Sequence, residues 1–180
     1  MIASLKGTLT SIGKSDIILE VNDVGYFLNV SSKSISSLGD LGSNLFLYTD
    51  LQIKDDKIIM YGFATFKDQN FFKLLQSVQG VGPRAALSIL STLNVDEIIL
   101  AISSGDKAMI ARADGVGPKV AGRITTELVD KVSVFNSNKS QETTFLQKSD
   151  KFQDKLNLES DEVIEDYTII VEDIISALVN

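Results

Sequence analysis

The sequence predicts a multidomain α+β protein, in which a small β-barrel precedes a helical domain, a flexible linker and a short C-terminal helical segment. Three observations indicate this order. Residues 2–63 form short runs of β-branched and aromatic residues separated by glycines, which is typical of strands. From Thr65 onward the apolar residues recur at helical spacing. Asn, Ser, Lys and Gln then dominate residues 136–155, before an acidic stretch. The expected divisions are 1–64, 65–135, 136–158 and 159–180.

The first division contains four or five expected strands, at residues 2–12, 16–30, 45–53 and 58–63. Val24-Gly25-Tyr26 interrupts the longest run and predicts a bulge or a bend at a barrel corner. One helical turn is expected at residues 35–38. Short strands at this density favour a small barrel of the OB type over a sandwich. Such barrels often bind nucleic acid, but a fold alone does not establish a function.

The helical division begins with a capping pair, Thr65 and Asp68. The first helix then presents an apolar face made of Phe71, Phe72, Leu74, Leu75 and Val78. Asn94 is the expected cap of a helix at 95–102, which Gly105 ends. A short helix is expected at 106–112 and a last one at 118–132.

A five-residue motif occurs twice in the helical division. Residues 80–84 are Gly-Val-Gly-Pro-Arg, and residues 115–119 are Gly-Val-Gly-Pro-Lys. Glycines permit a tight turn with positive φ, and proline suits the first position of the helix that follows. Backbone amides at such a helix N-terminus attract phosphate. One Gly-x-Gly turn is more often a plain helix cap, but a repeat with a cation at the same place indicates a tandem helix-hairpin-helix, the pattern of sequence-independent DNA binders.

The amino-acid composition excludes several kinds of chemistry. The chain has no Cys and no His, which excludes disulfides, thiol nucleophiles and histidine acid–base catalysis. We expect no catalytic residue, no metal site and no cofactor. Residues 1–9 do not resemble a signal peptide, and no apolar run approaches a membrane span. A cytoplasmic protein is therefore expected.

The formal net charge of −7 lies entirely in the C-terminal segment. Residues 156–180 hold seven acids and no base, so residues 1–155 carry equal numbers of acids and bases. A neutral body can still present one basic face to DNA. The acidic segment has apolar residues at helical spacing and is better suited to contact with a protein, with the body of this chain or with its own copies.

Residues 54–57, Lys-Asp-Asp-Lys, form the expected tip of a hairpin between the last two strands. Polar residues at such a tip most often make an ordinary solvated turn. Asp55 and Asp56 could also bind a metal, but no further acid cluster is placed to complete such a site. Catalysis is not expected at this turn.

Together these residues resemble the RuvA family of Holliday junction branch migration proteins. The resemblance covers about residues 1–135. It rests on Met1-Ile2, Leu5-Lys6-Gly7, Val24-Gly25-Tyr26, Tyr61-Gly62-Phe63 and both Gly-x-Gly turns. It implies a non-catalytic scaffold that holds a four-way junction open during recombination, repair of DNA damage and the SOS response. It also implies a homotetramer or a paired octamer, working with a RuvB-type hexameric ATP-driven motor and a RuvC-type resolvase.

The resemblance assigns roles to particular residues. Asp55 and Asp56 match the family's acidic pin, which repels phosphates near the crossover and favours strand separation. The DNA contacts carried over by position are Gly80, Gly82, Arg84, Gly115, Gly117, Lys119 and Arg123. A solvated surface arginine is the alternative for Arg123. The C-terminus departs from the family's motor-binding bundle of several helices, because only one convincing helix, at about 160–179, is present.

Two other functions stay open at this point. One is a metal-dependent junction nuclease that uses Asp55 and Asp56. The other is a general single-strand DNA-binding barrel, in which aromatic residues such as Tyr26 or Phe27 stack on bases.

Overall fold

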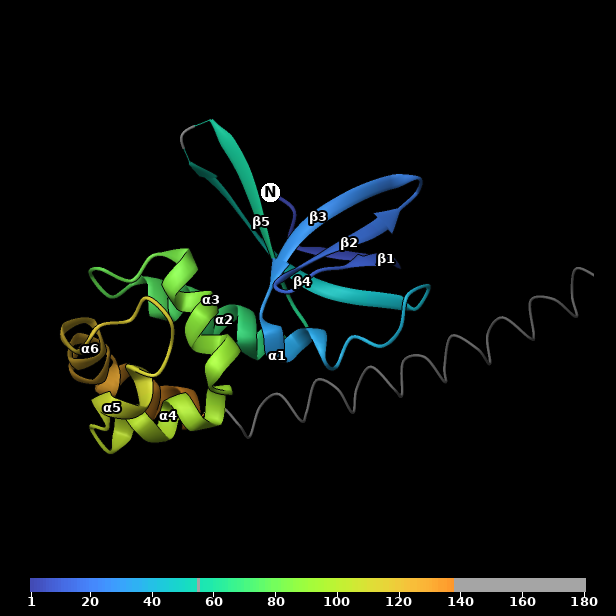
Figure 1. Ribbon diagram of the computed structural model, residues 1–180. Coiled ribbons are helices and arrows are strands. Elements are labelled where there is room, and N and C mark those ends of the chain that lie inside the picture. The colour runs from blue at the N-terminus through green and yellow to red at the C-terminus, as the bar shows by residue number, and fades with distance from the viewer. Residues whose placement is uncertain (55, 138–180) are drawn as a thin grey trace, which may run out of the picture. The chain divides into compact units, whose positions relative to one another are not determined.

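The computed structural model describes residues 1–54 and 56–137. Residues 1–133 form one compact unit, in which a closed five-stranded barrel is followed along the chain by helices (Figure 1). This confirms the predicted α+β class and the order of barrel and helices. Asp55, nearly all of the expected linker at 136–158 and the expected acidic segment at 159–180 lie outside the described residues.

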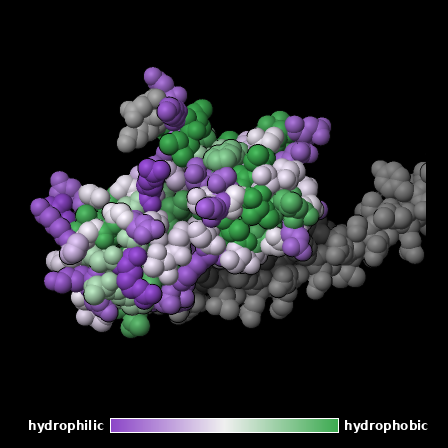
Figure 2. Space-filling view, in the orientation of Figure 1, coloured by the Kyte–Doolittle hydropathy of each residue, from purple (hydrophilic) through white to green (hydrophobic). Residues whose placement is uncertain are grey.

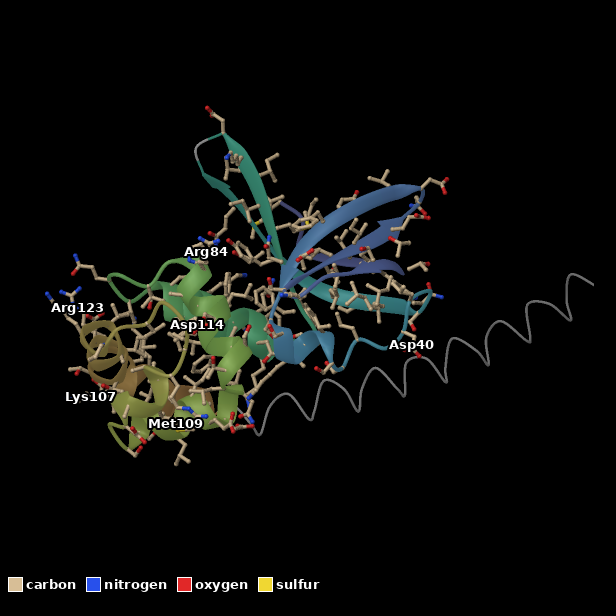
Figure 3. All side chains as sticks on the ribbon, in the orientation of Figure 1. Asp40, Arg84, Lys107, Met109, Asp114 and Arg123 are labelled. Carbon is tan, nitrogen blue, oxygen red and sulfur yellow. The ribbon has the colours of Figure 1, made fainter. Side chains whose placement is uncertain are left out.

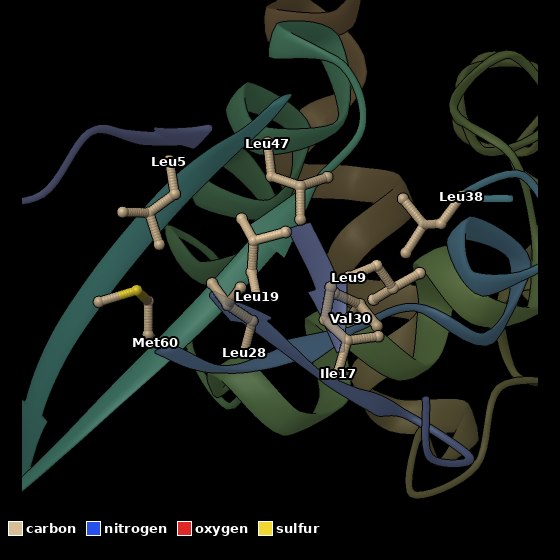
Figure 4. Close-up of a cluster of buried hydrophobic side chains, with 9 residues drawn as sticks. All are labelled: Leu5, Leu9, Ile17, Leu19, Leu28, Val30, Leu38, Leu47 and Met60. Carbon is tan, nitrogen blue, oxygen red and sulfur yellow. The ribbon is translucent and has the colours of Figure 1, made fainter. Parts of the chain in front are cut away.

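The barrel consists of β1 (Ser4–Ile12), β2 (Asp16–Val21), β3 (Val24–Val30), β4 (Asn44–Lys54) and β5 (Lys57–Phe63). The strands close in the order β1-β2-β3-β5-β4, and every neighbouring pair is antiparallel except β3 with β5. Alternate side chains point inward and form the apolar core shown in Figure 4, which contains Leu5, Leu9, Ile17, Leu19, Leu28, Val30, Leu38, Leu47 and Met60.

The break in the long second strand differs from the sequence prediction. The chain reverses at Asn22 and Asp23, which have φ values of 51° and 64° and join β2 to β3 as a hairpin. Asn and Asp tolerate this left-handed conformation better than other residues with a side chain. Gly25, where a bulge or bend was expected, instead lies within β3 and pairs with Glu20. The expectation of a bulge at residues 24–26 was therefore wrong.

A short helix, α1 (Ser32–Ile35), connects β3 to β4. It begins three residues before the helical turn expected at 35–38. The reason is local, because the Ser31 hydroxyl caps the helix by accepting a 3.0 Å hydrogen bond from the Ser34 amide. Ser-rich sequence therefore starts this helix, and the apolar Leu38 that suggested a later turn packs in the barrel core instead.

The helices are α2 (Phe66–Gln76), α3 (Pro83–Thr92), α4 (Val95–Ser103), α5 (Lys107–Ile110) and α6 (Pro118–Ser137). The predicted caps are confirmed: Thr65 accepts from the Asp68 amide, and Asn94 forms a capping box. No single helix in the described ranges has both the length and the hydropathy of a membrane span, although α3 and α4 taken together across a 99° bend meet that criterion.

The helices pack on the barrel through α2. The Phe72 ring lies 4.9 Å from the Tyr61 ring and 4.8 Å from the Phe63 ring, both on β5. Beside them the buried Gln69 side chain donates a 2.6 Å hydrogen bond to the carbonyl of Thr49 on β4. An apolar contact and a satisfied buried amide therefore hold α2 in one orientation against the barrel.

Candidate nucleic-acid interface

The two copies of the Gly-Val-Gly motif adopt the same turn. In the first copy the Val81 amide donates to the Val78 carbonyl at 3.0 Å, and in the second the Val116 amide donates to the Ala113 carbonyl at 3.1 Å. The first glycine of each copy has positive φ, 95° at Gly80 and 78° at Gly115. This conformation favours glycine, because a Cβ atom would be strained there.

Each turn buries its valine and exposes its glycines. Val81 and Val116 are 4% and 5% exposed and anchor the loops in the helical core. The glycines on either side of each valine lie at the surface. An apolar residue that points inward therefore turns the backbone of its neighbours outward, where a ligand can approach it closely.

The helix that follows each turn starts at the same point. The Ala86 amide donates to the Gly82 carbonyl, and the Ala121 amide donates to the Gly117 carbonyl, both at 3.0 Å. The prolines Pro83 and Pro118 are the first residues of α3 and α6. No side chain caps the N-terminus of α3, so its positive end is open to an anion.

A groove of about 660 Å³ joins residues of both copies. Gly82 and Arg84 line it from the start of α3, and Asp114 and Gly115 line it from the second turn. Figure 3 shows Arg84 and Asp114 beside α3, below the projecting β4–β5 hairpin. The fold thus brings two turns that are 35 positions apart in the sequence to one hollow surface, with Asp114 as an acidic residue among the candidate phosphate ligands.

Four serines also line this groove, and they were not predicted from the sequence. The serines are Ser15, Ser32, Ser88 and Ser91. Ser88 was accessible to sequence reasoning, because it lies one helical turn after Arg84 and therefore on the same side of α3. Ser91 lies one turn farther along α3. Ser15 comes from the β1–β2 connection and Ser32 from α1, and the packing of α1 on α3 brings Ser32 here: the Ser32 amide donates to Ser91 Oγ at 3.1 Å.

The remaining candidate residues lie outside the groove lining. Gly80, Gly117 and Lys119 are exposed, with Lys119 at the second position of α6. Arg123 is half-buried, and its Nη1 donates a 3.2 Å hydrogen bond to the carbonyl of Gln79. A side chain of the second motif therefore contacts the backbone just before the first turn.

Arg84 also acts on the barrel. The pKa of the Tyr61 hydroxyl is raised, mainly by burial and next by the nearby Asp50 carboxylate, while the positive charge of Arg84 acts in the opposite direction. Arg84 therefore lies within electrostatic range of the base of the β4–β5 hairpin, close to the start of α3 and to the groove.

The two acids at the hairpin tip differ in what the structure describes. Asp56 is exposed and has a φ of 59°, as a residue in a tight turn does, whereas Asp55 lies outside the described residues. Lys54 and Lys57 form the last cross-strand pair before the turn. Within residues 1–54 and 56–137 there is no group of three Cys, His, Asp or Glu side chains placed to bind a metal ion.

Two family models match the chain. The model described as RuvA N terminal domain matches residues 1–62, and the model described as SAM-like Helix-hairpin-helix tandem matches residues 72–130. The first match covers almost the whole barrel, and the second contains both Gly-Val-Gly turns.

Curated relatives carry the name Holliday junction branch migration complex subunit RuvA. The relative from Azorhizobium caulinodans is 43% identical over 137 residues, which are 76% of this chain and 66% of the relative. The relative from Xanthobacter autotrophicus is 41% identical over 138 residues, 77% of this chain and 67% of the relative. The relative from Sphingopyxis alaskensis is 46% identical over 131 residues, 73% of this chain and 66% of the relative.

The chain thus spans about two thirds of the length of these relatives. With this identity and this coverage, the chain belongs to the RuvA family.

Proposed function

We propose that this protein binds four-way junction DNA and serves as the non-catalytic DNA-binding subunit of a branch migration complex. The observation that supports this most is the groove in which Gly82 and Arg84 of the first motif meet Gly115 of the second. Amides at helix N-termini with a nearby cation suit phosphate oxygens, which carry no sequence information. Binding that follows the sugar–phosphate backbone is what a protein needs if the junction is to move through any sequence.

The proposed DNA contacts come from both motifs and from α6. They are Gly80, Gly82, Arg84, Gly115, Gly117, Lys119 and Arg123. The glycines would offer backbone amides at a surface without side chains, and the cations would neutralise phosphates next to them. Arg84 and Lys119 occupy the same position in the two copies, which supports equal roles for them.

We further propose that Asp55 and Asp56 form an acidic pin. The β4–β5 hairpin projects from the barrel (Figure 1) and carries these residues at its tip. Carboxylates at the crossover would repel phosphates and favour separated strands, an effect that salt screens over about 10 Å at 0.1 M.

The proposed partners are a RuvB-type hexameric motor, which would hydrolyse ATP, and a RuvC-type resolvase. The proposed assembly is a homotetramer, alone or paired as an octamer, around one junction. Sedimentation of the full chain with and without a synthetic junction measures both the assembly and its substrate.

Binding to a synthetic four-way junction, compared with a duplex of equal length, tests the main proposal. We expect much tighter binding to the junction, with an affinity that falls steeply as salt rises because bound phosphates release counterions. Equal affinity for the duplex would contradict a junction-specific role. Magnesium added to the labelled junction tests for a nuclease instead, and cleavage that Asp56→Asn abolishes would overturn the non-catalytic assignment.

Removing the paired cations tests the proposed contacts. We expect the double variant Arg84→Ala, Lys119→Ala to bind the junction about 100-fold more weakly, roughly tenfold for each cation lost, and to lower the salt slope by about 2. Lys107→Ala is the matched control, because Lys107 is an exposed lysine on α5 that does not line the groove (Figure 3). A loss of about tenfold in this control, the same per cation removed, would show that net charge, and not these positions, governs binding.

Neutralising the pin tests its charge. We expect Asp55→Asn with Asp56→Asn to raise junction affinity several-fold, because repulsion of phosphates is removed, and to slow motor-driven branch migration. Gel-shift titration and a strand-exchange assay measure the two effects. Unchanged affinity and rate would make the tip an ordinary turn.

A further inference from the structure

The β4–β5 hairpin extends beyond the barrel as a two-stranded ribbon. β4 pairs with β1 only from Asn44 to Tyr48, and β5 pairs with β3 only at Tyr61 and Gly62. Between these points and the tip, β4 and β5 pair with each other. Figure 1 shows this ribbon projecting away from the remaining strands.

One face of the ribbon continues the apolar pattern of the barrel core. Leu51 and Met60 are a cross-strand pair that packs in or against the core. Two residues farther along each strand, Ile53 pairs with Ile58 on the same face. These two side chains are 72% and 70% exposed, and Figure 2 shows hydrophobic surface just below the hydrophilic tip.

The other face of the ribbon is attached to α2. Gln52 Nε2 donates to Asp50 Oδ2 at 2.8 Å and to Gln76 Oε1 at 2.9 Å, and Lys73 Nζ lies 3.7 Å from Asp50 Oδ1. These bonds hold the ribbon at a fixed angle to the helices. The isoleucine pair is therefore presented on a rigid support.

The isoleucine pair alone is too small to form a stable interface with another protein. A stable protein interface buries about 800 Å² on each partner, which two side chains at the end of a ribbon do not supply. Isoleucine is instead one of the apolar residues that proteins insert between base steps. Arg84, one of the proposed phosphate contacts, lies within electrostatic range of Tyr61 at the base of the ribbon, on the α2 face and opposite the face that carries the isoleucines.

From these observations we propose that Ile53 and Ile58 form an apolar wedge that contacts unstacked nucleobases at the crossover of the junction. The inference rests on the proposed function, because bases are open to such a contact only where the duplexes are interrupted. The acids at the tip would repel phosphates, while the isoleucines would cover the base faces that separation leaves in water. The pair thus adds a base-contacting site to a protein whose other proposed contacts are with the backbone.

The double variant Ile53→Thr, Ile58→Thr tests the wedge. Threonine keeps the β-branched shape that suits a strand and replaces the ethyl group of isoleucine with a hydroxyl. The probe is 2-aminopurine placed at the crossover of a synthetic junction, because its fluorescence rises when the base unstacks. At saturating protein we expect the variant to give less than half of the rise that the unchanged protein gives, with junction affinity altered less than threefold.

Val24→Thr is the matched control, since Val24 is 53% exposed on β3, outside the ribbon. We expect it to give the full fluorescence rise. A full rise with the isoleucine variant would overturn the wedge and leave the proposed function standing. A variant with full fluorescence but altered sedimentation would overturn it too, because the pair would then contact a second copy of the chain. Failure of the unchanged protein to prefer a junction would instead overturn the proposed function.

Discussion

At the scale of single residues, Arg123 connects the two helix-hairpin-helix motifs. Its Nη1 atom donates to the carbonyl of Gln79, which lies 44 positions earlier and immediately before the first turn. A guanidinium has five N–H donors, so this bond leaves capacity for a phosphate. The residue proposed as a DNA contact is therefore also a positioning residue for the first turn.

Replacing Arg123 tests this double role. We expect Arg123→Lys to keep the charge but lose the fixed donor geometry, so that the Val81 amide, which donates to the Val78 carbonyl, exchanges hydrogen faster and junction affinity falls about tenfold. Hydrogen exchange and binding measure the two effects. Lys119→Ala should weaken binding without altering exchange at the first turn. Equal protection in all three proteins would restrict Arg123 to a surface role.

The glycines of one turn differ in what they tolerate. Gly80 has a φ of 95°, whereas Gly82 has a φ of −86° and open space where a Cβ atom would lie. We expect Gly80→Ala to lower the free energy of unfolding by about 1–2 kcal/mol because of backbone strain. Gly82→Ala should leave stability nearly unchanged but weaken DNA binding, since its methyl group would stand where a phosphate approaches. Thermal unfolding and junction titration distinguish the two effects.

The repeat made much of this site predictable from the sequence. Glycine, proline and the cation recur at one spacing, and each has a local reason for its position. The Arg123–Gln79 bond and the places of Ser15 and Ser32 in the groove were not predictable, because they depend on how segments far apart in the chain pack together. The alternation of apolar and polar residues likewise predicted the barrel. It did not show that Ile53 lies on the β4–β5 ribbon, beyond the parts of these strands that pair with β1 and β3.

At the scale of elements, the start of α4 shows how a cap can also join two parts of the fold. The Asn94 amide donates to Glu97 Oε2 at 2.7 Å, and Lys33 Nζ of α1 lies 3.1 Å from the same oxygen. These two contacts, the backbone hydrogen bond first, lower the pKa of the Glu97 carboxyl below its ordinary value.

The cap therefore makes stability depend on pH. A carboxyl with a lowered pKa in the folded state stabilises that state above its unfolded pKa, and this stabilisation is lost as pH falls through the folded pKa. We expect Glu97→Gln to be less stable than the unchanged protein at neutral pH, with the difference disappearing in acid. Urea unfolding at several pH values measures this. Glu127→Gln, an exposed change on α6, is the control, and a difference that persisted in acid would contradict the linkage.

Two elements show where apolar spacing fails to predict the boundaries of helices and strands. The helix α1 begins where the Ser31 hydroxyl caps it, and the β2–β3 hairpin turns at Asn22 and Asp23 without a glycine. In both cases polar residues determine the boundary, whereas the prediction rested on apolar spacing and on Gly25. Caps and turns depend on single hydrogen bonds and dihedral angles, and the spacing of apolar residues over a whole segment does not locate them.

At the scale of the whole molecule, the barrel and the helices share a buried polar contact. Gln69 is 4% exposed, and its amide donates to the Thr49 carbonyl at 2.6 Å. We expect Gln69→Leu to destabilise the protein by about 1–3 kcal/mol, because the carbonyl would stay buried without its donor. Denaturant unfolding followed by tyrosine fluorescence and by circular dichroism measures this. Gln79→Leu makes the same chemical change at an exposed loop and should have little effect.

The attachment of Gln52 to Gln76 has a mechanical consequence. Helix α2 ends at Gln76, four residues before Gly80, so the same helix supports the projecting hairpin and leads into the first Gly-Val-Gly turn. If a motor pulls duplex across the protein as proposed, the forces on the bound DNA backbone and on the hairpin would both act on this one helix. Helix α2 would then act as a rigid connection. The distance between the first Gly-Val-Gly turn, which is proposed to hold the DNA, and the hairpin tip, where the strands are proposed to separate, would stay constant from one step of migration to the next.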